Sequence, residues 1–588
     1  MTNAHNSITD THDPFGTALI TRLANESYRE SIGLAQSSSP LQGASSSAPI
    51  VPTAFIGIPD GLSGIAGTPP TFPTTPAAFS AEKPDHTTLA GGYPSATAAY
   101  PESGWTEQPS RSATARSGDD LDSGEHLPDS PEVYPFGEPR CNGSFKATDV
   151  YAQTVGSPSG FYFLPEPDQR GGLVSGESSG TQALSLVEVD AIRRDFPILH
   201  QRVHGHPLIW FDNAATTQKP RDVIEATSRF YRQDNSNIHR AAHALAARST
   251  ELYESGREKV RQFIGAADSK EIIFVRGTTE AINLVAQTYG RAHIHAGDEI
   301  LLTTMEHHAN IVPWQLLAQQ TGAVLRIAPI NDDGELILDA FASLLGPRTK
   351  LVAVTHVSNA LGTINPIETI VGLARAHGAR VLVDGAQSIP HLPINVQTLG
   401  CDFFVFSGHK LFGPTGIGVL YGKLPLLEEM PPYQGGGNMI RDVTFEHTTY
   451  QGSPQKFEAG TPDIAGVIGL GAAVDYLTRI GMPAIAAYEH ELLEYATQAL
   501  ASVRGLRPIG TAATKASVLS FVMDGIPNER VGQYLDRHGI AVRSGHHCAQ
   551  PTVRRFGQEG TVRPSLAFYN TYEEINVLVE VLHKLRRA

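Results

Sequence analysis

Beyond about residue 187, short apolar runs alternate with stretches in which apolar residues recur at helical spacing. The apolar runs are rich in Val, Ile, Leu and Phe, and they read EIIFVRG, DEILLTT, AVLRIAPI, KLVAVTHVS, ARVLVDGA and CDFFVFSG. Stretches such as TTEAINLVAQTYG and ETIVGLARAHG lie between them. Buried strands that alternate with helices predict an α/β fold, with a mostly parallel sheet covered by helices on both faces. In such folds, ligands bind beyond the carboxyl ends of the strands.

The pattern changes near Ala465, where a smaller C-terminal α/β unit is expected to begin. We predict a large domain over residues 187–464 and a small domain over residues 465–588. The small domain ends in NTYEEINVLVEVLHKLRRA, a predicted helix whose first turn carries a capping box of Thr571 and Glu574.

The first part of the chain has a different composition. Residues 1–190 contain 8 Lys or Arg against 22 Asp or Glu, and they hold 20 of the 40 prolines. Their balance of −14 accounts for nearly all of the net charge of −15. A segment so rich in Pro, Ser and Gly cannot bury enough apolar surface to offset chain entropy, so we predict a disordered acidic arm over residues 1–186.

Three apolar islands interrupt this arm, at residues 15–23, 134–136 and 161–164. They are either stray hydrophobic residues in a linker or short motifs that dock on a partner. The pattern alone leaves both interpretations open.

Composition also excludes several classes of protein. No basic cluster indicates binding to nucleic acid, and no apolar run reaches the roughly 18 residues of a membrane helix. The start, MTNAHNSITDTHDPFG, lacks the basic and apolar regions of a signal peptide. The three cysteines, Cys141, Cys401 and Cys548, are too few for a disulfide framework. We therefore expect a protein of the reducing cytoplasm.

Lys410 lies directly after the apolar run of residues 403–406, within FSGHKLFGPTGIG. An ammonium group there is costly unless it is paired or used chemically, or unless only its stem is buried. Other polar residues follow the neighbouring strands, and Thr278 and Thr279 open a helix whose free N–H groups favour a phosphate. The rest of this set is His307, His356, Asn359, Asp384, Gln387, Ser407 and His409. Each could be a cap or a turn, but so many at one sheet edge indicate a site.

A carboxylate, a phosphate cradle, a flat stacking group and a lysine together suit pyridoxal phosphate. At these residues, from about Val187 to Ala588, the chain resembles the group II (SufS-like) cysteine desulfurases, which are fold-type I pyridoxal phosphate enzymes. The strings that carry the resemblance are FDNAATTQKP, RGTTEAINLVA, EHHANIVPW, HVSNALGT, VDGAQS, FSGHKLFGPTGIG, FEAGTPD, RSGHHCAQP and RPSLAFYNT.

The resemblance implies a role for each matching position. Lys410 would hold the cofactor and move the α-proton of the substrate, and Asp384 would pair with the ring nitrogen. Gln387 would contact the ring hydroxyl, and His307 would stack on the ring as a catalytic residue. The phosphate would be bound by Thr278, Thr279, Ser407 and His409, with Thr461 reaching in from a second subunit. The substrate carboxylate would be bound by Asn359, Arg543 and Arg563, since guanidinium groups suit that task.

Cys548, in RSGHHCAQP, admits three interpretations. It could be an inert buried cysteine, or a zinc ligand together with His546 and His547. Adjacent residues of an extended segment point to opposite faces, so these three could hardly bind one metal, and we expect no metal site. Neighbouring His and Arg residues favour a thiolate. The resemblance makes Cys548 the thiol that attacks the substrate sulfur, while Cys401 is expected to be structural.

The sequence is therefore interpreted as a homodimeric cysteine desulfurase that converts L-cysteine to L-alanine and carries the sulfur as a persulfide. Selenocysteine lyase is the nearest alternative, and a scaffold with a vestigial enzyme domain is a more distant one. The sulfur could pass to an acceptor protein or to iron–sulfur cluster assembly. The arm of residues 1–186 resembles that of encapsulated cysteine desulfurases, which implies loading into an encapsulin shell that stores sulfur.

Overall fold

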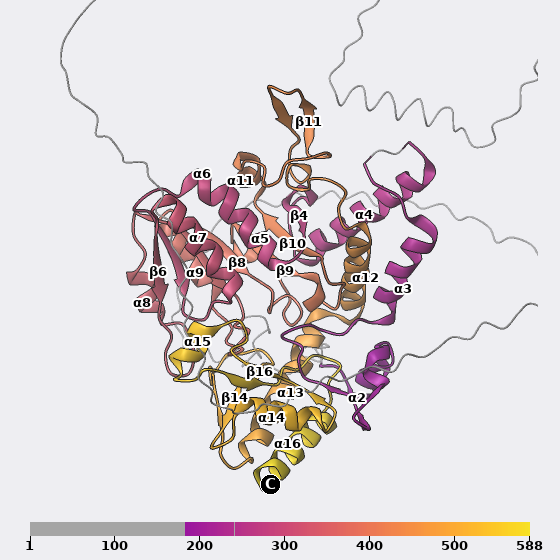
Figure 1. Cartoon of the computed structure of the whole chain (residues 1–588), viewed down its shortest axis with the longest axis vertical. Helices are drawn as coiled ribbons and strands as arrows, with labels where there is room; N and C mark the ends of the chain where they lie inside the picture. Colours follow the sequence, from indigo (N-terminus) through magenta and orange to yellow (C-terminus); the bar gives the residue numbers. More distant parts are fainter. Residues whose placement is uncertain (1–182, 240–241, 588) are drawn as a thin grey trace, which may run out of the picture. The chain divides into compact units, whose positions relative to one another are not determined.

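The computed structural model describes residues 183–239 and 242–587 (Figure 1). The disorder prediction for residues 1–182, the three apolar islands of the arm and Cys141 lie outside the described residues. The description below begins with the large sheet, because its strand ends carry most of the predicted site.

A seven-stranded sheet forms the centre of the large domain, with the strand order β4-β10-β9-β8-β7-β5-β6. All of its neighbouring strands pair in parallel except β10, which is antiparallel to both β4 and β9. Its strands are β4 (Ile272–Val275), β5 (Glu299–Thr303), β6 (Val324–Ala328), β7 (Thr349–Thr355), β8 (Arg380–Asp384), β9 (Phe403–Ser407) and β10 (Gly418–Gly422). The six predicted strands are confirmed, and β10 is the one that the sequence analysis missed.

The strands are apolar on both faces because both faces are covered. In β4, Ile273 and Val275 pack into one hydrophobic cluster with α5 and α7, while Ile272 and Phe274 pack into another with α4, α9 and α12. The helices of this part are α3 (Arg221–Arg229), α4 (Ala244–Phe263), α5 (Thr278–Val285), α6 (Arg291–His293), α7 (Val312–Thr321), α8 (Leu338–Ser343), α9 (Ile367–Ala376), α10 (Val396–Leu399), α11 (Leu424–Glu429) and α12 (Ile464–Ile480). This arrangement confirms the predicted α/β class.

The C-terminal part carries a second sheet of four strands in the order β13-β14-β17-β16. These strands are β13 (Leu506–Pro508), β14 (Phe521–Met523), β16 (Arg543–Gly545) and β17 (Thr561–Arg563). The helices around them are α13 (Met482–Ala501), α14 (Asn528–Asp536), α15 (Gln550–Arg555) and α16 (Tyr572–Arg587). The predicted capping box of α16 is present, because Glu574 N donates to Thr571 Oγ1 and Thr571 N donates to the Glu574 carboxylate. The domain boundary at residues 464/465 stays a prediction.

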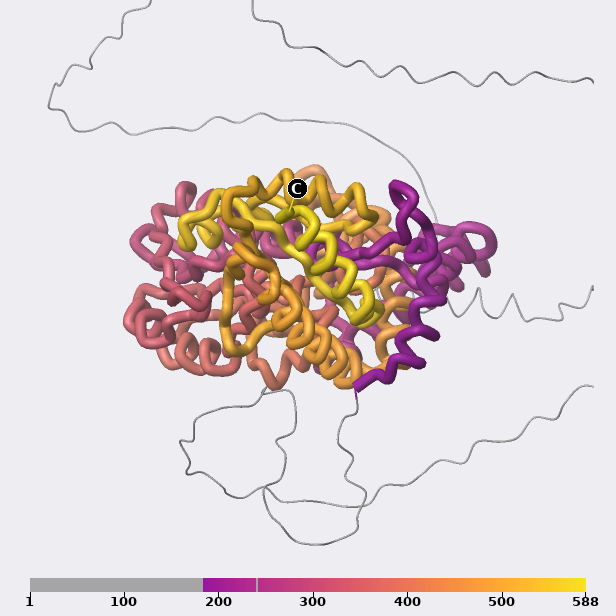
Figure 2. Tube along the Cα trace, turned by 90° about the horizontal axis from the view of Figure 1, so that it is seen from below, coloured from indigo at the N-terminus to yellow at the C-terminus, as the bar shows by residue number. Residues whose placement is uncertain are grey.

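The segment before α3 connects the two parts. Strand β3 (Ile209–Trp210) pairs in parallel with β15 (Ile540–Ala541), and Arg193 of α2 (Leu186–Arg193) forms an ion pair with Glu574 of α16 at 2.8 Å. Figure 2 shows this early segment, in indigo, beside the yellow C-terminal part. Two short hairpins complete the described fold: β1 (Arg202–Val203) with β2 (His206–Pro207), and β11 (Ile440–Val443) with β12 (Thr448–Tyr450).

Over residues 183–239 and 242–587, no single helix is long and apolar enough to cross a membrane. The helices α12 and α13 reach the required length and composition only as a pair, across a bend of 76°.

Candidate active site

A cavity of about 750 Å³ lies at the carboxyl ends of the parallel strands β4, β5, β7, β8 and β9. Twelve of the thirteen predicted site residues line it: Thr278, Thr279, His307, Asn359, Asp384, Gln387, Ser407, His409, Lys410, Arg543, Cys548 and Arg563. Thr461 does not, and it lies instead in a separate hollow with His239 and Asn438. His356 is fully buried behind the cavity.

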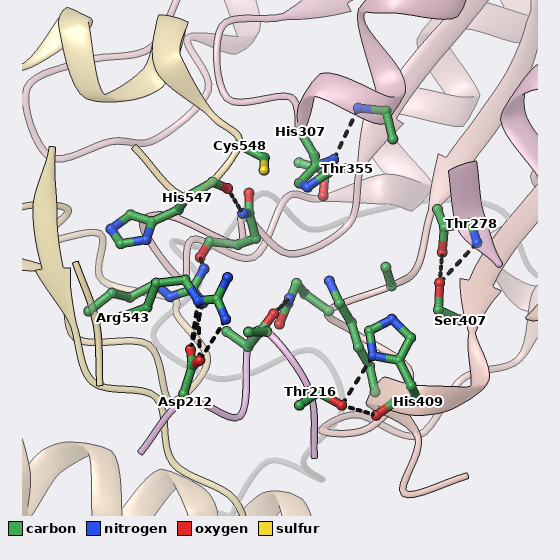
Figure 3. A pocket seen from close by; sticks show the side chains of 18 of the residues that line it. Asp212, Thr216, Thr278, His307, Thr355, Ser407, His409, Arg543, His547 and Cys548 are labelled. Atoms are coloured by element: carbon green, nitrogen blue, oxygen red, sulfur yellow. Dashed lines mark hydrogen bonds and ion pairs between the residues drawn. The ribbon is translucent and has the colours of Figure 1, made fainter. Parts of the chain in front are cut away.

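One end of the cavity is formed by the start of α5 and the end of β9. Thr278 N donates to Ser407 Oγ at 2.9 Å, and the two hydroxyl oxygens lie 2.8 Å apart (Figure 3). Gly277 has a φ of 157°, and a Cβ there would lie 3.2 Å from Ser407 Oγ. The backbone can therefore approach a ligand closely here. A helix N-terminus beside two hydroxyl groups suits a phosphate.

The middle of the cavity contains the carboxylate of Asp384 and the amine of Lys410. Asp384 is buried at the end of β8 and accepts a hydrogen bond from Ala386 N at 2.9 Å. Burial raises its pKa, and the backbone bond and the charge of Lys410 counteract that rise. Burial lowers the pKa of Lys410 to about 8, against the opposing attraction of Asp384. The unprotonated, nucleophilic form of Lys410 is therefore more abundant near neutral pH than that of an ordinary lysine.

His307 and Gln387 lie beside this pair. His307 Nδ1 accepts a hydrogen bond from Ala309 N at 3.0 Å. Burial, together with the positive charges of Lys410 and Arg563, lowers the pKa of His307 to about 3, so its ring is neutral at physiological pH. Gln387 donates its side-chain amide to the Ala214 carbonyl at 2.6 Å, which fixes its orientation. A neutral ring held by its backbone neighbour suits stacking on a flat cofactor.

The other end of the cavity carries two arginines that share one carboxylate. Arg543 Nη2 lies 2.9 Å from Asp212 Oδ2, and Arg563 Nη2 lies 3.3 Å from Asp212 Oδ1. Arg563 is 2% exposed, and burial lowers its pKa to about 10. Two cations against one anion leave a net positive charge. Arg563 Nε and Asn359 Oδ1 are buried without a hydrogen-bond partner among the described residues, so this end is built to receive a further polar group.

Cys548 lies on a strained turn after β16. His547 and Cys548 both have a φ of 54°, which is unfavourable for residues with a side chain. The turn is held at three points: Asn359 Nδ2 donates to the His547 carbonyl at 2.7 Å, His547 Nε2 lies 2.8 Å from Thr561 Oγ1, and His308 N donates to the Cys548 carbonyl at 2.8 Å. The Cys548 side chain is exposed and faces the same opening as His307 (Figure 3).

The structure separates the two described cysteines by environment. Cys401 is buried before β9, and burial raises the pKa of its thiol to about 12, so the thiol is protonated at neutral pH, which agrees with the structural role expected of it. Among the described side chains, no group of three or more His, Cys, Asp or Glu is placed to hold a metal ion.

Sequence reasoning missed three residues around the cavity. Asp212 bridges the two arginines, Lys219 lies behind His409, and Glu306 is buried beside the end of β7. The sequence held a signal for each of them. Asp212 follows the apolar run LIWF, and Asp212 and Lys219 both lie in the string FDNAATTQKP. Glu306 directly precedes His307. Their long-range partners are 49 to 351 residues away in sequence, so spacing could not assign those contacts.

The described residues fit pyridoxal phosphate. The phosphate would lie at Thr278, Thr279, Ser407 and His409, the ring beside His307, Asp384 and Gln387, and the aldehyde at Lys410. The buried and unpartnered Arg563 Nε would donate to the carboxylate of a bound amino acid, whereas Asn359 Oδ1 can only accept a hydrogen bond from a donor group. The donor set therefore matches each polar group of the cofactor and its substrate.

Comparison with known proteins agrees with this geometry. The model of the class-V aminotransferase family matches residues 209–578. The chain is 62% identical over 404 residues to the probable cysteine desulfurase 1 of Mycobacterium leprae, a match that covers 69% of this chain and 66% of that protein. It is 51% identical over 399 residues to a probable cysteine desulfurase of Vibrio cholerae, covering 68% of this chain and 98% of the relative.

Solved structures give the same result. The chain matches the cysteine desulfurase CsdA of Escherichia coli with a TM-score of 0.64 and 42% identity, over 68% of this chain and 98% of that one. The matched part spans only 58% to 66% of the length of three curated relatives. The chain belongs to the class-V aminotransferase family, and within it to the cysteine desulfurases.

Proposed function

We propose that the protein is a cysteine desulfurase that converts L-cysteine to L-alanine and holds the sulfur as a persulfide on Cys548. Pyridoxal phosphate is the cofactor typical of its family. The observation that carries the proposal is the common cavity of Lys410, Asp384 and Cys548. The match to the class-V aminotransferase family supports it, because the matched residues 209–578 include all three of these residues.

The residues of the chain divide the reaction among them. Arg563 and Asn359 bind the substrate carboxylate, and Asp384 keeps a proton on the ring nitrogen of the cofactor. Lys410 Nζ holds the cofactor and later accepts the proton from the substrate α-carbon. When bound, pyridoxal phosphate withdraws electrons from that carbon.

Cys548 performs the sulfur transfer. Its thiolate Sγ attacks the substrate sulfur, so that an S–S bond forms while the substrate Cβ–S bond breaks. The substrate Cβ takes the electron pair of the broken bond and then a proton, and L-alanine leaves. One thiol and one cysteine thus give one persulfide and one alanine, with no external oxidant. The turn at His547 and Cys548 presents the thiol at the mouth of the cavity, where a later acceptor can also reach it.

The test compares Cys548→Ser with Cys401→Ser. We expect the Cys548 variant to keep its visible cofactor absorbance and to release no sulfide under reductant, while the Cys401 control stays active. Mass spectrometry of the wild type after treatment with L-cysteine should find the added sulfur on Cys548. Sulfur found only on Cys141 or Cys401 would contradict the assignment. Activity of Cys548→Ser on selenocysteine would favour the selenocysteine lyase alternative.

We also propose a homodimer in which Thr461 completes the site of the second subunit. Thr461 lies outside the cavity of its own chain, and its segment is fixed by the fully buried pair of Glu458 and Arg257, whose atoms approach to 2.8 Å. A rigid segment that ends in an exposed threonine suits a contact in trans.

Mixed dimers test this arrangement. Lys410→Ala chains and Thr461→Arg chains should each be inactive, and their hybrid should regain activity, because one of its two sites then has both intact residues. A hybrid without activity would contradict the contact in trans. The mixture is compared with each variant alone at the same protein concentration.

We propose that the arm, residues 1–186, targets the enzyme to an encapsulin shell in the cytoplasm. The sulfur would then be stored there or passed to an acceptor protein. Residues 1–186 lie outside the residues 209–578 that the family model matches, so the arm is additional to that shared part. On co-expression with an encapsulin, shells should capture the full-length enzyme and a foreign protein fused to residues 1–186. Equal capture of the chain without the arm would contradict the proposal.

A further inference from the structure

The loop that follows β3 holds the turn that carries Lys410. The carbonyl oxygen of His409 accepts hydrogen bonds from Thr216 Oγ1 at 3.1 Å, Thr217 N at 3.1 Å and Lys219 Nζ at 3.0 Å. Thr217 Oγ1 also lies 3.2 Å from this oxygen, so four donor atoms surround one carbonyl that has only two lone pairs. They fix the peptide bond that joins His409 to Lys410.

Lys219 is an unusual donor for this purpose. Its ammonium group forms no ion pair with any described residue, and besides His409 it donates to the Thr217 carbonyl at 2.5 Å and to Thr216 Oγ1 at 3.4 Å. Burial lowers its pKa to about 8. Lys219 is not among the residues that line the cavity, so its effect on a bound ligand would be indirect. A half-buried ammonium that only carbonyl and hydroxyl oxygens solvate is a costly way to stabilise a fold.

The same loop also holds the far side of Lys410. Thr217 Oγ1 contacts the Lys410 carbonyl at 3.2 Å and accepts a hydrogen bond from Phe412 N at 2.9 Å. Phe412 has a φ of 59°, which keeps this turn tight. Thr216 Oγ1 lies 3.2 Å from His409 Nδ1, a contact drawn in Figure 3. The loop therefore determines the direction of two neighbouring side chains, one at the proposed phosphate end and one at the proposed aldehyde.

We propose that Lys219 is a positioning residue, which holds the His409–Lys410 peptide so that Lys410 points at the cofactor aldehyde and His409 at its phosphate. This inference deepens the proposed function and rests on it. Loss of the ammonium leaves the His409 carbonyl with weaker support, so the two side chains lose their alignment together. A misplacement of about 1 Å is enough to slow a reaction about 100-fold.

The test uses Lys219→Met, which keeps the stem and removes the donor, and Lys219→Arg, which restores a cationic donor. The matched control is Lys515→Met. Lys515 is also half-buried, burial also lowers its pKa to about 8, and its Nζ also donates to a backbone carbonyl, that of Gly510 at 2.7 Å. We measure the release rate of bound pyridoxal phosphate, followed by loss of visible absorbance, together with kcat and KM for L-cysteine.

In Lys219→Met, release should be at least about ten-fold faster and kcat at least about ten-fold lower, with KM within about two-fold of the wild type. Lys219→Arg should recover most of both losses, and Lys515→Met should behave as the wild type. A wild-type release rate and kcat in Lys219→Met would overturn the inference. Equal losses in Lys515→Met would overturn it as well, because burial alone would then explain them.

Thr217→Val covers the case in which Lys219→Met does not fold, since it removes the hydroxyl contacts to Lys410 and Phe412 from the same loop. It should show the same joint loss, and a wild-type release rate would overturn the inference. Failure of the proposed function is distinguishable, because the wild type itself would then bind no pyridoxal phosphate or Lys410→Ala would still attach it.

Discussion

Glu306 should make the stability of the fold depend on pH. Its carboxylate is fully buried and accepts hydrogen bonds from Thr303 Oγ1 at 2.6 Å, Asn310 Nδ2 at 2.7 Å and Thr355 N at 3.1 Å. Burial nevertheless raises the pKa of Glu306 from 4.5 to about 8, with a smaller contribution from the charge of Asp384. The folded chain therefore holds a proton on Glu306 at neutral pH.

The sign and size of the effect follow from this difference in pKa. Between pH 4.5 and about 8, the folded chain binds a proton that the unfolded chain releases, so the free energy of unfolding falls as the pH rises. Each pH unit contributes about 1.4 kcal/mol, so Glu306 lowers the free energy of unfolding by about 3 kcal/mol between pH 4.5 and pH 7. Glu306→Gln cannot titrate and should lose this slope.

Denaturant unfolding of the cofactor-free chain, at one protein concentration and several pH values, measures the difference between wild type and Glu306→Gln. That difference should shift by about 3 kcal/mol in favour of the variant from pH 4.5 to pH 7, on top of a constant offset from the changed hydrogen bonds. The exposed residue Glu446, changed to Gln, is the control and should leave the slope unchanged. Parallel curves for wild type and Glu306→Gln would refute the reasoning.

Three further predictions concern the site and its support. Pyridoxal phosphate should attach to the cofactor-free chain faster as the pH rises through about 8, because Lys410 then loses its proton, and Lys410→Ala should show no attachment when followed by visible absorbance. Arg563→Lys should raise KM for L-cysteine at least about ten-fold in steady-state kinetics, because an ammonium cannot replace the planar fork at a buried carboxylate site. Glu458→Gln should lower the free energy of unfolding by about 3 kcal/mol in denaturant melts, because the buried Arg257 would lose its buried anion and keep only the partly exposed Glu254.

The sequence predicted the strands well where the signal was local. β5, β7, β8 and β9 are apolar runs bounded by polar residues, and the side chains after them converge because parallel strands share one edge. β10 was missed because GVLYG has a glycine at each end and is antiparallel to its neighbours, so it breaks the alternation of strand and helix that predicted the rest. Its glycine has a packing reason, since a Cβ at Gly418 would lie 2.5 Å from Gly277 Cα.

The sequence did not predict the residues that hold the site residues in place. The ion pairs of Asp212 and the contacts of Lys219 join segments that only the folded chain brings together, so no periodicity indicates them. For Thr461, the sequence motif did suggest a site residue, but in the structure Thr461 lies outside the cavity of its own chain.

The ion pairs of Asp212 join segments that leave the ribosome at very different times. Asp212 lies 331 residues before Arg543 and 351 residues before Arg563, yet all three meet in one ion-pair cluster. On the ribosome, the segment with Asp384 and Lys410 emerges before the segment that supplies both arginines and Cys548. A nascent chain thus contains Lys410 well before it contains Cys548. The cavity around Cys548 is not complete until Arg563 of β17, the last strand, has been synthesised.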